Sequence, residues 1–427
     1  MQHYFYKISI ILLCLMNNLS AQDLDLTIDR PTYLYSYFTP GHLQDLTNAS
    51  ARGMASLSAA NRLPNTLNFY NPAALTNMSL TTFDSGFDFN RSSFSNNAQN
   101  IRSTDANIAY LSMGFPVAKF WTTSVGLNSY SRVNYDLLDT QENASLGNQS
   151  LEYLGEGQLY RIYWGNGFKI LPSLSVGVQG MYHFGHINKT VNFAADSLAT
   201  GYTVRKNDYS NYNGFSGLAS FQWHPLLRKG DKPLMLIVGS FVEWESSIKR
   251  KNRTYWNRLD AYGNEIDGNL FLEENITTDV SLPSVYGVGF SLATNNWLLG
   301  IEAQMHQWGD VSWDNSSFTQ NDTRIALGGM FVPSTESTRP WLQRVSYRMG
   351  LYYHSGYLNI NEQAIQRLGL TFGFGLPLSR KMPSTLNLSF DLGQKGTTEN
   401  SLYQENYFFT TIGINLNDKW FIKRKFD

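Results

Sequence analysis

The sequence predicts an all-β fold, a 14-stranded antiparallel transmembrane β-barrel with an N-terminal hatch (plug) in its lumen. Three observations support it: segments of about ten residues alternate apolar and small polar side chains, charged residues make up only 16% of 427, and short connections alternate with long polar ones. In such a barrel, lipid covers the apolar faces of the strands. The mean hydropathy of −0.30 is too low for a helical membrane bundle.

The N-terminus, residues 1–21, is expected to be a secretory signal peptide. Lys7 supplies the positive charge, Ile8 to Met16 form a short apolar core, and cleavage is expected after Ala21. This core is too short to span a bilayer. A buried N-terminal helix and a lipoprotein cysteine at Cys14 are the alternatives.

Cys14 is the only cysteine and it lies in this leader, so the mature chain is expected to have no disulfide and no cysteine metal site. The seven histidines lack metal-ligand spacing, and nucleotide-binding or hydrolase motifs are absent. We therefore expect no metal, no cofactor and no enzymatic activity. The net charge of −1 gives no basis for binding nucleic acid.

Residues 80–417 are predicted to form the barrel. In the clearest strand, Leu386, Leu388, Phe390 and Leu392 occupy one face and small or polar residues the other. Fourteen such segments can be assigned, and an even number returns both ends of the chain to the periplasm. They cover residues 80–90, 105–115, 119–133, 158–170, 173–186, 212–224, 233–246, 283–293, 296–307, 322–333, 343–355, 366–377, 384–394 and 405–416.

The connections predict which side of the membrane each strand end faces. Short connections are expected to be periplasmic turns, and the long polar ones to be outer loops. The predicted outer loops are 91–104, 134–157, 187–211, 247–282, 308–321 and 395–404. Aromatic residues at strand ends predict two interfacial girdles. The periplasmic girdle would contain Phe120, Trp121, Trp223, Trp297, Trp341 and Trp420, and the outer girdle Tyr130, Trp244, Trp308, Tyr352 and Tyr353.

The two ends of the mature chain do not alternate. Residues 22–79 are too many for a tail and too poor in apolar side chains for a separate core, which favours a hatch folded against the polar lumen. Residues 418–427 are predicted to be a short basic periplasmic tail. Lys249-Arg250-Lys251-Asn252-Arg253 is a basic cluster at the start of the longest predicted loop, for which a solvated loop is favoured and contact with lipopolysaccharide phosphates is the alternative hypothesis.

Three stretches of the N-terminal segment form a recognisable pattern: Tyr35-Ser36-Tyr37-Phe38, Ala51 to Ala55, and Asn68 to Ala74. Together they resemble the hatch of FadL-type outer-membrane long-chain fatty acid transporters. It implies that Asn71, Pro72 and Ala73 form the hatch motif just before the first strand, and that the barrel has fourteen strands. The leader and the ending Trp420 to Lys425 resemble members of the family from the Bacteroidota.

Alternation also predicts which charged residues face the lumen. They are Asp84, Asp88, Arg161, Glu302, His306, Arg324, Arg348 and Asp391. Arg161 and Arg348 are candidates for binding a ligand carboxylate, but pairing with each other or with the hatch is favoured, because buried charges need partners. Gly126 and Asn128, on the third strand, mark a candidate kink in the wall.

These features predict a channel in the outer membrane of a Gram-negative cell, for passive uptake of hydrophobic small molecules such as long-chain fatty acids. Membrane lipid, lipopolysaccharide and the hydrophobic ligand are the expected partners. The alternative is a barrel that does not transport and instead serves as a subunit or scaffold of an outer-membrane protein secretion or assembly complex. The polar outer segments favour this alternative.

Overall fold

The computed structural model describes residues 33–39, 41–96, 100–143, 147–195, 203–230, 233–260, 262–266, 271–309, 311, 318–360 and 362–420. The predicted signal peptide and the last seven residues of the predicted tail lie outside these ranges. No helix among the described residues is long and apolar enough to cross a membrane.

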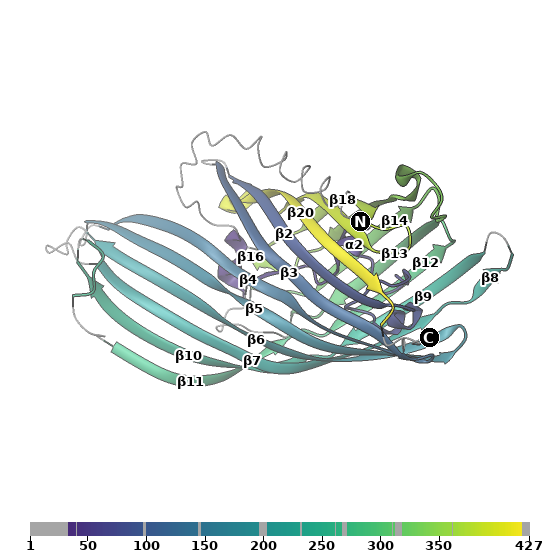
Figure 1. The fold of residues 1–427 in the computed structure, drawn as a ribbon. Helices are drawn as coiled ribbons and strands as arrows, with labels where there is room; N and C mark the ends of the chain where they lie inside the picture. The colour runs from purple at the N-terminus through teal and green to yellow at the C-terminus, as the bar shows by residue number, and fades with distance from the viewer. Residues whose placement is uncertain are drawn as a thin grey trace, which may run out of the picture.

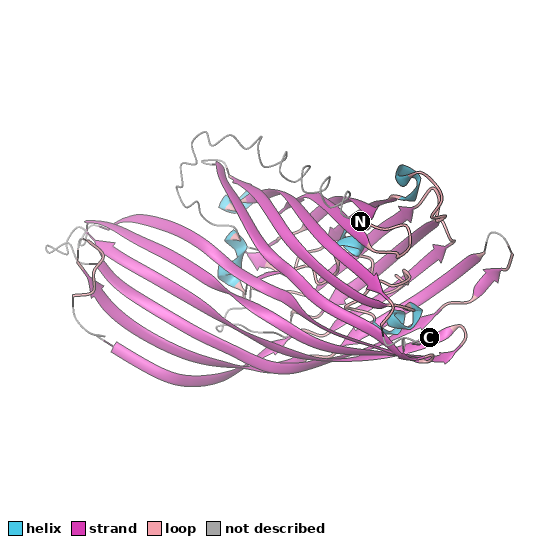
Figure 2. Cartoon of the chain, viewed as in Figure 1, coloured by secondary structure: helices cyan, strands magenta, loops and turns pink. Residues whose placement is uncertain are grey.

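The barrel has fourteen antiparallel strand positions, as predicted, and it closes between the first and the last of them (Figures 1 and 2). The closing pair runs from Thr81 opposite Asp418 to Ser95 opposite Gln404. Twelve positions hold one strand each: β2 (Thr81–Ser95), β3 (Asn100–Ala118), β4 (Trp121–Asn143), β5 (Gly147–Leu171), β6 (Leu174–Ala195), β7 (Thr203–Trp223), β13 (Trp297–His306), β14 (Asp322–Phe331), β15 (Ser346–His354), β18 (Arg367–Pro377), β19 (Thr385–Lys395) and β20 (Gln404–Asp418).

The other two positions are interrupted strands. In the first, β9 (Leu234–Glu243) continues as β10 (Ser246–Leu259), and in the second, β11 (Phe271–Leu282) continues as β12 (Val285–Ala293). Short elements complete the chain: η1 (Leu34–Phe38), β1 (His42–Leu43), α2 (Ala49–Arg52), η2 (Pro72–Asn77), β8 (Leu226–Arg228), η3 (Trp341–Arg344), β16 (Asn359–Ile360), β17 (Gln363–Ala364) and η4 (Glu399–Ser401).

The wall shows the predicted alternation between an apolar outside and a polar inside. Along β14, Asp322 and Arg324 are buried in the lumen, whereas Ile325 and Leu327 are exposed on the outer surface. On β12, every second residue from Tyr286 to Leu292 is a large exposed apolar side chain. These side chains belong to a continuous apolar band, which lipid would cover.

The outer girdle was predicted only in part. Trp244 and Tyr353 are exposed, but Tyr130, Trp308 and Tyr352 are buried. Tyr352 and Tyr353 are neighbours on one strand and therefore point to opposite faces, so only one of them can reach lipid. On the periplasmic side, the predicted residues are exposed or half-buried: Phe120, Trp121, Trp223, Trp297, Trp341 and Trp420.

Most of the predicted outer loops are wrong, because these residues continue the strands. The β4–β5 ladder extends to Asn143 opposite Gly147, and the β6–β7 ladder to Phe193 opposite Val204. β5 has 25 residues, while about 9–11 suffice to cross a bilayer. Beyond the apolar band both faces of a sheet can be polar, so the hydrophobic alternation fades while the backbone hydrogen bonds persist.

We call this extension the outer sheet. It consists of the ends of β4, β5, β6 and β7 beyond the apolar band, together with β10 and β11. It occupies the left half of Figure 1. An apolar cluster on its lumenal side includes Tyr135, Leu159, Ile187 and Ile248, and it packs against Leu46 of the N-terminal segment.

Candidate functional site: the N-terminal segment and the lumenal cavity

The N-terminal segment, residues 33–39 and 41–79, packs against the inner face of the wall. Its Asn71-Pro72-Ala73 motif begins η2, where the Asn71 side chain accepts a hydrogen bond from the Ala73 amide. The Asn71 amide group donates to the carbonyl of Ala59, at 2.6 Å, and to that of Phe221 on β7, at 3.3 Å. The motif therefore joins two parts of the segment to the wall.

Glycines in the wall allow this close approach. A Cβ atom at Gly177 would lie 2.3 Å from the Ala73 nitrogen, and one at Gly239 would lie 1.8 Å from the Ala59 oxygen. A Cβ atom at Gly53 of the segment would lie 2.9 Å from the Cα atom of Gly373. The segment and the wall thus meet backbone to backbone.

Charged residues fix the segment at two further points. Arg52 of α2 forms an ion pair with Asp88 of β2 at 2.5 Å and donates to the Thr411 hydroxyl. The Glu302 carboxylate accepts hydrogen bonds from the backbone amides of Ser58 and Ala59, both at 2.7 Å. Lumenal charges therefore pair with the hatch, as favoured from the sequence.

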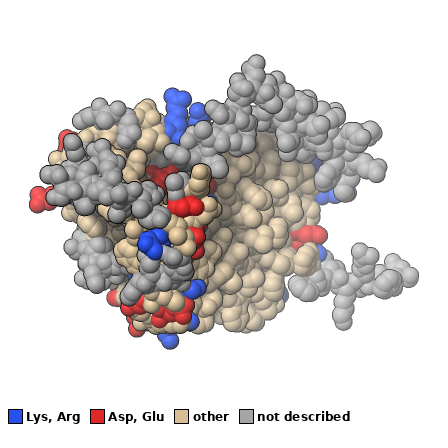
Figure 3. Space-filling model, turned by 90° about the vertical axis from the view of Figure 1, so that its left-hand side faces the viewer, with Lys and Arg blue, Asp and Glu red and all other residues tan. Residues whose placement is uncertain are grey.

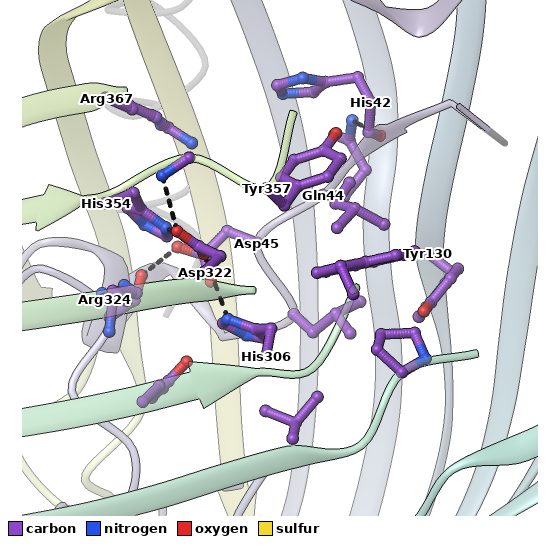
Figure 4. Close-up of a pocket in the computed structure, with 18 of the residues that line it drawn as sticks. His42, Gln44, Asp45, Tyr130, His306, Asp322, Arg324, His354, Tyr357 and Arg367 are labelled. Carbon is purple, nitrogen blue, oxygen red and sulfur yellow. Dashed lines mark hydrogen bonds and ion pairs between the residues drawn. The ribbon is translucent and has the colours of Figure 1, made fainter. Parts of the chain in front are cut away.

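A cavity of about 140 Å³ lies between this segment and the outer ends of β13, β14 and β15 (Figure 4). Within it, Asp322 accepts from the Gly356 amide at 2.8 Å and lies 3.3 Å from His306 and 3.4 Å from His354. Other ionisable side chains line it: His42, Asp45, Glu243, Arg324, Arg367 and Lys395. No group of three or more His, Cys, Asp or Glu among the described residues could hold a metal ion.

The size and lining of this cavity restrict its ligands. Binding sites for drug-sized molecules occupy roughly 300–1,000 Å³, and a cavity of about 150 Å³ holds benzene. The volume here is therefore too small for a long acyl chain. Apolar side chains such as Leu43, Tyr130 and Trp308 line it together with the ionisable ones.

The two candidate ligand-binding arginines do not meet in this cavity. Arg161 is fully buried beside it, 3.6 Å from the Glu243 carboxylate and 5.8 Å from the centre of the Tyr70 ring. Arg348 donates to Asn387 at 2.9 Å and lines a separate recess near Pro64 and Pro383. The sequence did not single out His354 or Asp322, although both lie at the outer ends of predicted strands.

Of the candidate kink, Asn128 lies at the point where the wall separates, and Gly126 lies two residues inside the paired region, opposite Ser112. The β3–β4 ladder ends at Tyr110 opposite Asn128, and beyond that level the two strands diverge (Figure 1). Each strand also carries a bulge in its ladder with its second neighbour. Ala109 of β3 is skipped in the ladder with β2, and Tyr130 of β4 is skipped in the ladder with β5. A bulge bends its strand, and these two bulges lie at the level where β3 and β4 cease to pair.

The N-terminal segment covers the edge of β4 beyond this separation. His42 and Leu43 of β1 pair with Arg132 and Ser131, and the Gln44 amide donates to the Tyr130 carbonyl. Along β3, the exposed apolar Ile108 lies at the level of the separation, and the outward positions beyond it include Thr104 and Arg102. The separation therefore begins near the outer limit of the apolar band.

Comparisons with known structures identify the architecture. A FadL homologue from Pseudomonas aeruginosa is 11% identical, with 88% of this chain and 98% of that chain covered and a TM-score of 0.62. The toluene transporter TodX from Pseudomonas putida is 15% identical over 87% of this chain and 98% of that chain, with a TM-score of 0.59. The toluene transporter TbuX from Ralstonia pickettii is 11% identical over the same shares, with a TM-score of 0.56.

These similarities show a fold shared with outer-membrane hydrocarbon channels, and they confirm the FadL-type architecture predicted from the hatch motif. No curated protein matches the sequence significantly. The family model described as BamG matches residues 5–427, almost the whole chain. The chain therefore belongs to the BamG family.

Proposed function

We propose that the protein is a scaffold subunit of an outer-membrane protein complex and holds a partner protein on its outer side. The observation that supports this proposal is the outer sheet. β4 to β7, β10 and β11 extend well beyond the apolar band. They form a sheet whose two edge strands are β4 and β11. A channel requires only the membrane-spanning part of a barrel, whereas a scaffold requires a rigid surface outside the membrane.

The filled lumen also favours a scaffold. The N-terminal segment is held by Asn71, Arg52 and Glu302, and its backbone touches wall glycines. A hydrophobic molecule crossing the lumen would have to displace paired, buried charges, which costs several kcal/mol for each pair broken. In the cavity beside the segment, ionisable side chains such as Asp45, Asp322 and Arg324 interrupt the apolar lining.

The test is purification of the tagged protein from outer membranes in mild detergent, at its natural expression level. A scaffold is expected to bring a protein partner in a fixed stoichiometry, measured by native mass spectrometry. A tagged, unrelated 14-stranded barrel from the same membranes is the control. Recovery of a lone barrel that carries a bound hydrophobic molecule would contradict the proposal.

Passive uptake of a small hydrophobic compound is the second candidate. The separation of β3 and β4 beside the lumen favours it, because the wall has no backbone ladder there, in a fold shared with hydrocarbon channels. The size of the cavity suits an aromatic ring better than a fatty acid. With Asp105 and Arg132 both replaced by cysteine, a bifunctional maleimide whose spacer contains a disulfide can bridge the separation, since the sequence after Cys14 has no other cysteine. Uptake of toluene by proteoliposomes should then fall on cross-linking and recover when the spacer is reduced.

A further inference from the structure

The outer sheet ends in a strand edge that no described strand pairs with. β11 pairs with β10 from Ser246 opposite Leu282 to Trp256 opposite Phe271. On its other side, β13 ends at His306, which pairs with Val285 of β12, so it stops before reaching β11. In Figure 1, β11 forms the lower margin of the molecule. All side chains from Leu272 to Asp279 are exposed.

This edge differs from the other edge of the outer sheet. The free edge of β4 is covered in part by the chain's own N-terminal segment, through β1 and Gln44. Proteins normally protect edge strands with lysines, bulges or a covering segment. β11 has no lysine, and its single bulge, at Glu274 and Asn275, leaves Ile276 to Leu282 in regular register with β10.

Charge along the two strands indicates what could pair with the edge. On the outward face of β10, Lys249, Lys251 and Arg253 are exposed at alternate positions. On the same face of β11, Asp279 lies opposite Lys249, and Glu274 forms an ion pair with Arg253 at 3.1 Å. Acidic side chains also gather at the lower margin of this end of the molecule (Figure 3).

We infer that β11 is a docking edge for an extended, basic segment of a partner protein, which adds to the outer sheet as its next strand. Backbone hydrogen bonds would supply affinity, as in other cases of strand addition. The order of charge would then continue across the sheet, from basic β10 to acidic β11 to a basic partner strand. Favourable pairing requires two basic residues about four positions apart, opposite Asp279 and Glu274. This inference rests on the proposed scaffold function and names the site of contact.

A peptide of defined sequence can test the edge on the full-length chain in detergent. The probe is a nine-residue peptide of alternating threonine and valine with lysine at the third and seventh positions. We expect it to slow hydrogen exchange of alternate backbone amides from Leu272 to Asp279. A peptide with glutamate in place of lysine should bind about tenfold more weakly. A peptide with N-methyl groups on its pairing edge should not bind.

Variants of the chain supply the matched controls. E274K combined with D279K should weaken binding of the lysine peptide about threefold to tenfold, whereas E336K, on an exposed turn at the other end of the barrel, should not change it. The backbone N–H groups of Thr277 and Thr278 point to opposite edges of β11, and a proline removes the N–H at its position. Of T277P and T278P, the variant that removes the N–H on the free edge should abolish peptide binding and keep the ladder with β10. The other variant should disturb that ladder instead. Heat-modifiable gel mobility verifies that each barrel is folded.

The outcomes separate this inference from the proposed function. If a stoichiometric partner co-purifies with the wild type but is lost with E274K/D279K, both are supported. If the partner remains with that variant and the lysine peptide protects no β11 amide, the docking edge is wrong while the scaffold function stands. If no partner co-purifies and proteoliposomes take up toluene, the scaffold function is wrong. Slowed hydrogen exchange of the β11 amides by the lysine peptide would then still support strand addition at β11, and unchanged exchange would contradict it.

Discussion

Arg132 of β4 and Asp105 of β3 form an ion pair across the interval where these two strands have separated. The Tyr33 hydroxyl donates to the same Asp105 carboxylate at 3.2 Å, and the Arg132 guanidinium lies over the Tyr33 ring. One residue of the N-terminal segment, Tyr33, therefore contacts both strands of the separation. Side-chain contacts replace the missing backbone ladder.

Removing Asp105 should loosen this link. D105A leaves Arg132 and Tyr33 without their shared acceptor, and loss of such a half-buried contact costs about 1 kcal/mol. We expect hydrogen exchange at the Tyr33 and Gln44 amides, which are bonded to Asn134 and Tyr130, to accelerate about fivefold. E336A, which breaks an exposed ion pair with Arg339, should leave both rates unchanged. Equal rates in D105A and the wild type would show that the ion pair does not hold the segment.

Arg161 and Glu243 test whether lumenal arginines bind ligand or brace the barrel. R161M leaves a buried carboxylate without its partner and should lower the free energy of unfolding by about 3–5 kcal/mol. The double variant R161M/E243Q should recover most of this loss, because no buried charge remains unpaired. Urea unfolding of the refolded barrel in detergent measures both changes. Additive losses in the double variant would contradict the pairing.

Gly177 and Gly180 provide a matched pair on β6. A Cβ at Gly177 meets the Ala73 nitrogen, whereas at Gly180 nothing lies within 4 Å. G177A should therefore displace the Asn71-Pro72-Ala73 motif and destabilise the protein by about 1–3 kcal/mol. G180A should change stability by less than about 0.5 kcal/mol. Limited proteolysis within residues 41–79 measures the displacement directly, and G177A should be cleaved faster than G180A. Equal cleavage rates of the two variants would contradict the close contact between Gly177 and Ala73.

His224, just after β7, is expected to make stability depend on pH. Burial, together with the nearby positive charge of Arg62, lowers the pKa of His224 to about 4, from about 6.5 in an unfolded chain. The neutral imidazole contacts the Ser175 hydroxyl, which in turn contacts Thr76 of the N-terminal segment. Above pH 6.5 neither state binds the extra proton, so this contribution is fully present there. As pH falls from 6.5 to about 4, only the unfolded state gains the proton, and stability decreases.

The measurement is the urea midpoint of the wild type and of H224Q at several pH values between 7.5 and 4. The wild type should lose stability across this window relative to H224Q, whose side chain does not titrate. Parallel pH profiles for the two proteins would show that His224 does not contribute.

The membrane-spanning strands could be predicted because lipid enforces a strict pattern. Ile325 faces hydrocarbon and Arg324 faces the lumen, so the polarity of each residue along β14 indicates which face of the wall it occupies. The ends of β4 to β7 lack this constraint. Asn192 and Arg205, for instance, pair across β6 and β7 where neither face borders lipid, and their polar sequence was therefore interpreted as a loop.

Partners within the lumen were less accessible to sequence reasoning. Arg161 was correctly placed inside the barrel, but Glu243 lies on a strand far along the chain, and only the closed barrel brings the two together. The kink was predicted at Gly126 and Asn128, and the end of the β3–β4 ladder also coincides with bulges at Ala109 and Tyr130 in the two neighbouring ladders. Local composition does not encode such register shifts.

Closure of the barrel imposes an order on biogenesis. The seam joins the earliest wall strand, β2, to the latest, β20, while the N-terminal segment touches backbone on strands throughout the circumference. Threading that segment into a finished cylinder would require these contacts to form through a narrow mouth. The wall strands are therefore expected to assemble around the N-terminal segment, and pairing of β20 with β2 would enclose that segment last.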